Sequence, residues 1–230
     1  GTSVSASRVV SGERPIHGEL EQAIAKAYAV EDAVAFVSGH ATNVSTLGYL
    51  LGPKDLILHD EYIHNSSLVG AQLSGAKRMS FSHNDPDALE ALLVQHRHQF
   101  ERVLVVIEGL YSMDGDVAPV DDFASLAERT GAMLLIDEAH AVGVCGPEGR
   151  GLAAHLHGCE NVVTLITCGK ALGCEGALIL APTVFRDFLV NRGRSFIFST
   201  APSPLIAAIV RESLSIVANA DERRQRLRLI

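Results

Sequence analysis

The chain contains 230 residues with a formal net charge of −8, and 47% of its residues are hydrophobic. This length and apolar content are enough for one substantial core, and an acidic chain without a basic stripe argues against nucleic acid as the main partner. No apolar run approaches the roughly 20 residues that a membrane-spanning helix needs, and no signal segment opens the chain.

Short apolar runs alternate with helical patterns along the whole chain. In chain order we predict a helix at residues 18–29, strands at 33–37 and 56–58, a helix at 85–99, a strand at 103–107, a helix at 119–130, and strands at 132–136, 162–166 and 176–181. Asp85 followed by Pro86 is a typical N-cap and first-turn pair. Apolar runs of this length separated by helices predict an α/β fold, with a mostly parallel sheet that helices cover on both faces.

Polar clusters follow three of the predicted strands. They occupy residues 108–116, 137–140 and 167–170. In an open α/β sheet, ligands bind outside the carboxyl ends of the strands. We therefore expect the three clusters to converge on one crevice.

Asp137 and Lys170 carry the most specific chemical signal. Asp137 follows five apolar residues and is either a strand-end acid that caps a helix or a partly buried carboxylate that needs a cation or strong donors. Lys170 lies in a turn of small residues between two strands, where it either extends to solvent or is desolvated and becomes a nucleophile. A nucleophilic lysine with a distant aspartate is the pair that pyridoxal phosphate (PLP) requires.

Two other kinds of site are disfavoured. The glycine-rich run at residues 143–151 does not have the G-x-G-x-x-G spacing of a dinucleotide-binding turn. The pairs His96 with His98 and His155 with His157 resemble exposed helix faces, and none has a cysteine or acid at a convincing zinc spacing. We predict no metal site.

The cysteines indicate the compartment in which the protein functions. The two ends of the sequence indicate how much of the protein is present. None of the four cysteines forms a Cys-x-x-Cys pair, so we expect reduced thiols and a cytoplasmic protein. The sequence starts at Gly1 rather than Met and stops at Ile230 within a charged helical pattern. We expect it to be a piece of a longer protein.

Two long motifs carry a resemblance to a known family. They are EGLYSMDGD at residues 108–116 and DEAHAVGVCGPEGRG at residues 137–151. With shorter segments between about residue 8 and residue 218, they resemble the α-oxoamine synthases, which are PLP enzymes of fold type I. The resemblance implies a PLP-binding large domain at residues 1–215 and, at residues 216–230, the start of a connection to a C-terminal small domain. That small domain and an N-terminal segment would be absent from this sequence.

The resemblance implies four catalytic residues. Lys170 would hold PLP through a Schiff base, and Asp137 would pair with the nitrogen of the pyridine ring. His64 would stack on the ring face and touch the substrate carboxylate. His140 would lie near the phenolic oxygen and the ring edge, together with Ser112 as a cofactor contact.

The other cofactor contacts that the resemblance implies surround the phosphate. Thr167 would bind the phosphate, and Gly39 and His40 would offer it backbone amides. Thr200 would reach the phosphate of the neighbouring subunit. Glu108 would line the site or order the loop that follows it.

The implied reaction is a decarboxylative condensation. A small amino acid would react with an acyl thioester of CoA or of a carrier protein, giving an α-amino ketone and carbon dioxide, in a homodimer with shared active sites. Two alternatives stay open, a fold-type-I aminotransferase and a non-catalytic subunit or scaffold of the same fold. The run SMDGD counts against the first, and the presence of Lys170, Asp137, His64 and His140 counts against the second.

Overall fold

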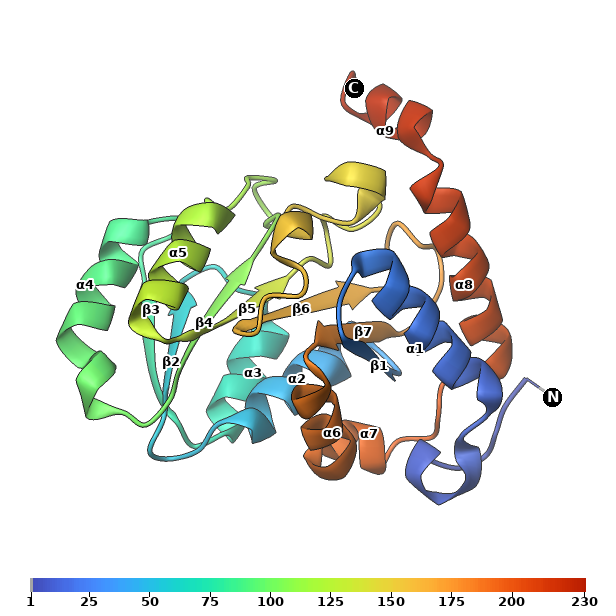
Figure 1. Cartoon of the computed structure of the whole chain (residues 1–230), viewed down its shortest axis with the longest axis horizontal. Coiled ribbons are helices and arrows are strands. Elements are labelled where there is room, and N and C mark those ends of the chain that lie inside the picture. The colour runs from blue at the N-terminus through green and yellow to red at the C-terminus, as the bar shows by residue number, and fades with distance from the viewer. Residues whose placement is uncertain (1) are drawn as a thin grey trace.

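The computed structural model describes residues 2–230, which form one seven-stranded sheet in the order β1-β7-β6-β5-β4-β2-β3 (Figure 1). Strands β2 to β6 are parallel, and β7 runs antiparallel to both of its neighbours. The predicted α/β fold with a mostly parallel sheet is confirmed. The strands are β1 (Asp32–Phe36), β2 (Leu56–Asp60), β3 (Lys77–Phe81), β4 (Val103–Glu108), β5 (Met133–Asp137), β6 (Val162–Thr167) and β7 (Ala177–Ala181).

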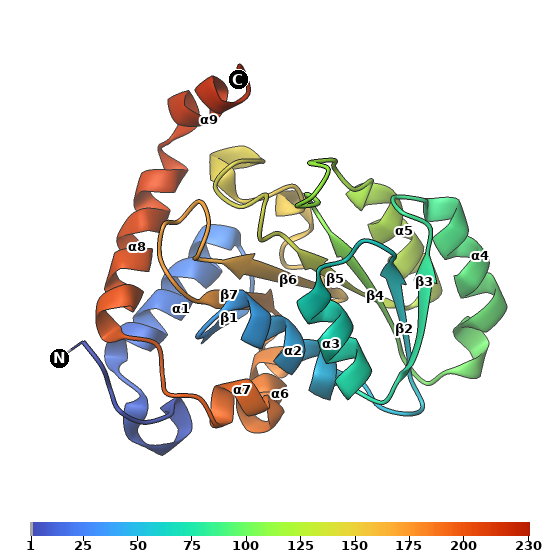
Figure 2. The same ribbon diagram turned by 180° about the vertical axis from the view of Figure 1, so that it is seen from behind.

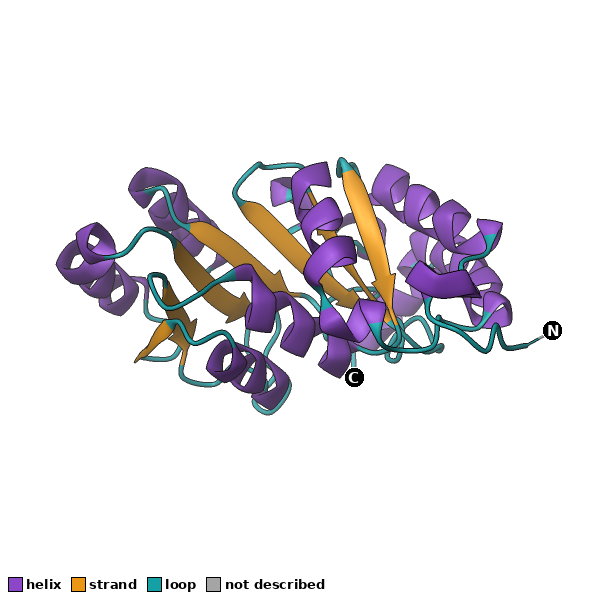
Figure 3. Ribbon diagram, turned by 90° about the horizontal axis from the view of Figure 1, so that it is seen from below, coloured by secondary structure: helices purple, strands orange, loops and turns teal. Residues whose placement is uncertain are grey.

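Helices cover both faces of the sheet, as the view from below shows (Figure 3). One face packs against α2 (Gly39–Leu50), α3 (Asn65–Leu73), α6 (Thr183–Arg192) and α7 (Arg194–Ile197), which lie in front in Figure 2. The other face packs against α4 (Pro86–His96) and α5 (Val120–Thr130) at one end, and against α1 (Pro15–Tyr28) and α8 (Pro204–Ala218) at the other. The short helix α9 (Asp221–Leu227) follows α8.

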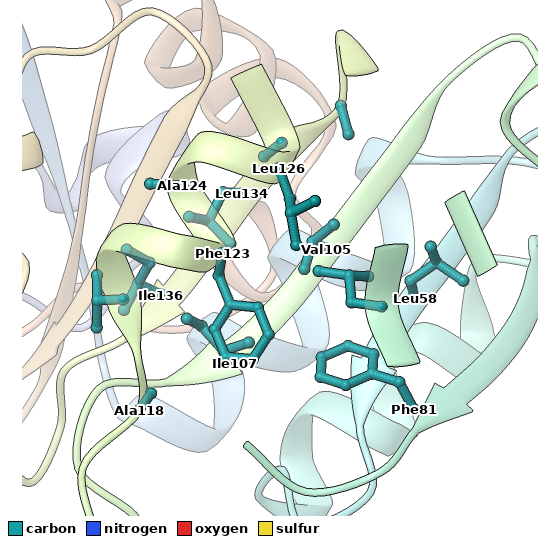
Figure 4. Close-up of a cluster of buried hydrophobic side chains, with 14 of the residues drawn as sticks. Leu58, Phe81, Val105, Ile107, Ala118, Phe123, Ala124, Leu126, Leu134 and Ile136 are labelled. Atoms are coloured by element: carbon teal, nitrogen blue, oxygen red, sulfur yellow. The ribbon is translucent and has the colours of Figure 1, made fainter. Parts of the chain in front are cut away.

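Strand β4 shows why the apolar runs are continuous rather than alternating. Val105 and Ile107 face α5, where Phe123 is fully buried against them (Figure 4). Leu104 and Val106 face the opposite cluster beneath α2. Successive side chains of a strand point to opposite faces, so a sheet covered on both sides needs apolar residues at every position. Burial of each such side chain contributes roughly 1.5–3 kcal/mol.

The predictions from the sequence omit strand β3 and the helices α2, α3, α6 and α8, and they misplace some helix ends. Strand β3 lies at the edge of the sheet, and most of its side chains are exposed, so its residues lack the apolar pattern of the other strands. Helix α1 begins earlier than predicted, with Pro15 in its first turn. The predicted cap of α4 is confirmed, because the Asp85 side chain accepts a hydrogen bond from the Ala88 N–H.

Helix α8 is the longest helix of the described chain, with 15 residues. The expected division after residue 215 falls within this helix, and it stays a prediction. Among residues 2–230, no helix is long and apolar enough to cross a membrane.

Candidate active site

A cavity of about 210 Å³ lies where β4, β5 and β6 end. The three polar clusters that follow these strands meet there, because the carboxyl ends of parallel strands share one edge of the sheet. Most of the predicted site residues line this cavity. They are Gly39, His40, His64, Glu108, Asp137, His140, Thr167 and Lys170.

Two predicted site residues lie elsewhere. Ser112 is exposed in the loop between β4 and α5, and Thr200 is exposed in the segment that follows α7; neither lines the cavity. The role of Thr200 was assigned to the site of a neighbouring subunit, so its position outside this cavity agrees with that assignment without testing it. Both roles stay predictions.

Lys170 and His140 form the closest polar contact across the cavity. Lys170 lies in the loop between β6 and β7, and its Nζ is 2.5 Å from His140 Nε2. Partial burial lowers the pKa of Lys170, although the charges of Asp137 and Glu108 oppose the shift. Burial and the charge of Lys170 also lower the pKa of His140. Both shifts favour the uncharged nitrogen, the form that a nucleophile or a proton acceptor needs.

Two buried carboxyl groups stand side by side at the ends of β4 and β5. Asp137 is 5% exposed and Glu108 is 4% exposed, and the two residues are paired in the β-ladder. Asp137 accepts hydrogen bonds from the Ala139 N–H at 3.0 Å and from Asn43 Nδ2 at 2.8 Å. Burial and the nearby charge of Asp137 raise the pKa of Glu108 to about 7. The donors orient Asp137, whereas Glu108 readily holds a proton.

A helix terminus and a threonine form one side of the cavity. Helix α2 begins at Gly39 after Ser38, whose hydroxyl accepts a hydrogen bond from the Ala41 N–H. The N–H groups of Gly39 and His40 precede the helical hydrogen-bond pattern, so they can bind an anion. A Cβ on Gly39 would lie 3.5 Å from Thr167 Oγ1, which shows that the two residues border one narrow space.

Sequence reasoning missed two polar residues of the cavity, Asn43 and Ser66. Asn43 lies four positions after Gly39, on the same face of α2, and its side chain reaches Asp137. Ser66 follows His64 by two positions at the start of α3, the spacing of an N-cap contact. A helix predicted over residues 39–50, with its faces mapped, would have found Asn43.

A second polar cluster holds the loops that carry site residues. His83 Nδ1 lies 2.9 Å from Asp60 Oδ1, and His83 Nε2 lies 2.6 Å from Asp116 Oδ2. Although burial opposes the shift, hydrogen bonds to these two carboxylates raise the pKa of His83. Asp60 ends β2 shortly before His64, and Asp116 lies in the loop after β4. His83 therefore ties together the loop that carries His64 and the loop that follows β4.

The interpretation of His155 and His157 as one exposed helix face is wrong for His157. Its ring packs against Tyr28 with 5.3 Å between ring centroids, and burial lowers its pKa to about 4. His155 is exposed and pairs with Asp121. The two histidines differ because the chain forms only a three-residue 3₁₀ turn here, Ala154–Leu156, which ends before His157.

Comparison with known proteins places the chain in a family. The family model described as aminotransferase class I and II matches residues 5–229. The chain belongs to this family. An 8-amino-7-oxononanoate synthase from Pelobacter propionicus is 43% identical to it over 231 residues, which cover 99% of this chain and 59% of that protein.

Solved structures give the same result. A serine palmitoyltransferase from S. paucimobilis with a bound PLP–myriocin aldimine matches with a TM-score of 0.92 and 30% identity, covering 99% of this chain and 59% of that one. An 8-amino-7-oxononanoate synthase from Francisella tularensis matches with a TM-score of 0.82 and 27% identity, covering 94% and 62%. The expected membership of the α-oxoamine synthases and the fold-type-I large domain are confirmed. The chain spans less than two thirds of the length of these relatives.

Proposed function

We propose that the cavity binds PLP, with Lys170 as its covalent attachment and Asp137 facing the nitrogen of its ring. The observation that carries this proposal is a lysine of lowered pKa beside His140, in a cavity whose wall contains a buried, oriented carboxylate. Other groups that line the cavity fit the phosphate and the aromatic ring of the cofactor. The start of α2 and the Thr167 hydroxyl suit a phosphate, and the His64 imidazole suits an aromatic ring face.

The residues of this chain have distinct tasks in that proposal. PLP, when bound, supplies an electron sink for a carbanion. Lys170 Nζ in its uncharged form accepts a proton from the α-carbon of an amino acid, and His140 Nε2 at 2.5 Å exchanges a proton with it. The Ala139 N–H and the Asn43 amide both donate to the oxygens of Asp137, so they hold its carboxyl group in place to face the ring nitrogen.

We infer that the complete protein joins a small amino acid to an acyl thioester of CoA or of a carrier protein, with loss of carbon dioxide. The names of the relatives, 8-amino-7-oxononanoate synthase and serine palmitoyltransferase, support this reaction over aminotransfer. Product analysis separates the two. Release of carbon dioxide supports the condensation, and exchange with a keto acid supports an aminotransferase.

We further propose that two copies associate near the cavity and share their sites. Three large side chains close in sequence to His64, Ser112 and Thr200 are exposed, Tyr62 at 57%, Met113 at 90% and Phe198 at 69%. Large exposed apolar side chains that come together on one surface favour a protein interface. A dimer would also give Thr200 a partner site. Light scattering on the purified protein would detect the dimer.

A cytoplasmic location is part of the proposal. All four cysteines are free, and Cys168 is buried as a small core residue. Free thiols are typical of a reducing compartment. Fractionation of cells that produce the protein would test this location.

Borohydride reduction followed by peptide mass mapping tests the cofactor proposal directly. The chain has four lysines, at positions 26, 54, 77 and 170. We expect a pyridoxyl adduct on Lys170 and none on Lys54, and the Lys54→Ala variant should behave as the wild type does. An unmodified Lys170 in folded protein saturated with PLP would contradict the proposal.

A further inference from the structure

We propose that Asn43 and Ser66 form a hydrogen-bond relay that fixes His64 in the tautomer with its proton on Nε2 and couples it to Asp137. We call the contacts His64–Ser66, Ser66–Asn43 and Asn43–Asp137 the tautomer relay. The three contacts are observed among the described residues. The effect that we expect on a substrate rests on the proposed function.

The first step is the start of α3, where His64 is the N-cap residue. Its Nδ1 lies 3.2 Å from the Ser66 backbone nitrogen and 2.7 Å from Ser66 Oγ. A backbone N–H can only donate a hydrogen bond, so Nδ1 must accept and cannot carry a proton in this arrangement. The neutral ring therefore has its proton on Nε2.

The second step sets the direction of the Ser66 hydroxyl. Asn43 Nδ2 lies 3.1 Å from Ser66 Oγ, and an amide nitrogen also only donates. Ser66 Oγ thus accepts from Asn43, which leaves its own hydrogen free to point at His64 Nδ1. Successive bonds with one direction strengthen each other.

The third step fixes the orientation of the Asn43 amide. Asp137 Oδ2 lies 2.8 Å from Asn43 Nδ2, and a carboxylate needs a donor rather than the amide oxygen at that position. Two members of the relay are also shielded from water, because Asn43 is 2% exposed and Ser66 is 1% exposed. A reversed amide would leave a buried carboxylate oxygen facing another oxygen, which is costly in such surroundings.

The consequence concerns the donor that His64 offers to the cavity. With Nδ1 occupied by Ser66, Nε2–H is the one ring donor left, and His64 lines the cavity. An N–H at this position attracts an anionic oxygen such as a substrate carboxylate, whereas the other tautomer would present a lone pair and repel it. Asn43 and Ser66 are thus positioning residues for His64.

Nitrogen NMR of the full chain labelled with ¹⁵N-histidine tests the relay without PLP. The His64 signals are identified as those lost in the His64→Gln variant. At neutral pH we expect His64 Nδ1 to have the chemical shift of an unprotonated ring nitrogen and Nε2 that of a protonated one. A proton on Nδ1 of the wild-type protein would overturn the proposal, and this measurement needs no variant of the relay.

Variants test the coupling. Ser66→Ala removes one hydrogen bond to Nδ1, so the ratio of the two His64 tautomers should change by roughly fivefold. Asn43→Leu keeps the branch at Cγ but removes both N–H donors, and it should also shift the His64 signals. Ser45→Ala is the matched control, because the Ser45 hydroxyl is buried on α2 with no hydrogen-bond partner among the described residues. His64 signals unchanged in folded Asn43→Leu, or in Asn43→Ser if the leucine prevents folding, would overturn the Asn43 step.

The outcomes separate this inference from the proposed function. A chain with the expected His64 tautomer that never traps PLP on Lys170 would remove the proposed function and leave the relay intact. A chain that traps PLP on Lys170 but has the proton on His64 Nδ1 would overturn the relay alone.

Discussion

Lys54 and Lys170 lie at opposite ends of the parallel strands. Lys54 is at the amino-terminal edge of the sheet and Lys170 is at the carboxyl-terminal edge. Lys54 precedes β2, and its Nζ lies 2.9 Å from a carboxylate oxygen of Glu101, which precedes β4. This hydrogen bond raises the pKa of Lys54. Lys170 follows β6, contacts His140 instead of a carboxylate, and has a pKa that burial lowers.

The carboxyl groups at the two edges also have pKa values that are shifted in opposite directions. Asp55 is 2% exposed and lies 2.7 Å from Arg102 Nη2, with a further hydrogen bond from the Gly52 N–H. Although burial opposes the shift, these donors lower the pKa of Asp55. Glu108 at the other edge is buried beside a second carboxylate, and its pKa rises to about 7.

This difference shows that one sheet carries stabilising ion pairs at one edge and groups suited to chemistry at the other. At the amino-terminal edge opposite charges are paired, and this pairing favours the ionised forms of Lys54 and Asp55. At the carboxyl-terminal edge burial and like charge favour the uncharged forms, the pattern that functional sites often show. Substitution of the buried Asp55 at the amino-terminal edge should therefore change stability, and substitution of Lys170 at the carboxyl-terminal edge should change chemistry.

The largest expected effect is that of Lys170→Ala. Removal of the amine should abolish the borohydride-trapped adduct and lower the activity of the complete protein by a factor of roughly 10²–10⁴, the contribution of a positioned proton acceptor. The unfolding midpoint in urea should change little, because the side chain is exposed on one side. If Lys170→Ala failed to fold, instead of folding without PLP capture, the proposed difference between the two edges would be contradicted.

Asp55→Ala should give the opposite result. The change leaves Arg102 and the Gly52 N–H without their acceptor, so we expect a loss of about 1–3 kcal/mol in the free energy of unfolding, measured in urea. The pKa of Asp55 is lowered in the folded chain, so its stabilisation is present above its unfolded pKa and is lost as the pH falls through the folded value. PLP capture by the folded variant should be unchanged, and a variant as stable as the wild type would contradict the pairing argument.

Glu108→Gln should change the dependence of stability on pH. Because the folded pKa of Glu108 is raised to about 7, its contribution to stability is full below the unfolded pKa and is lost as the pH rises through 7. Between pH 5 and pH 8 the wild type should lose on the order of 2 kcal/mol relative to Glu108→Gln, measured by urea unfolding at each pH. Parallel curves for the two proteins would show that Glu108 is not desolvated.

Lys54→Ala should have the smallest effect. The Lys54 and Glu101 side chains are 77% and 63% exposed, and exposed ion pairs contribute little to stability. We expect no measurable change in thermal midpoint at physiological salt and no change in PLP capture. A clear drop in the midpoint would mean that this edge depends on the pair more than its exposure suggests.

The sequence by itself determined the fold class and the main groups of the site. Buried strands such as residues 103–107 are recognisable because both of their faces need apolar side chains. One rule, that the carboxyl ends of parallel strands share one edge of the sheet, predicted that Glu108, Asp137 and Lys170 meet in one cavity. The resemblance to a family added Gly39, His40 and His64. Apolar patterns and the residues that follow a strand can both be recognised from neighbouring positions in the sequence, without knowledge of the tertiary structure.

Only the tertiary structure decided which side chains touch. Asn43 and Asp137 are 94 positions apart, and no periodicity in the sequence relates them. Edge strand β3 was missed because its exposed side chains lack an apolar pattern, and Ser112, although it lies within a site motif, is outside the cavity. Hydrogen bonds need atoms within about 3 Å in a set direction, and the packing of whole elements against each other sets such distances.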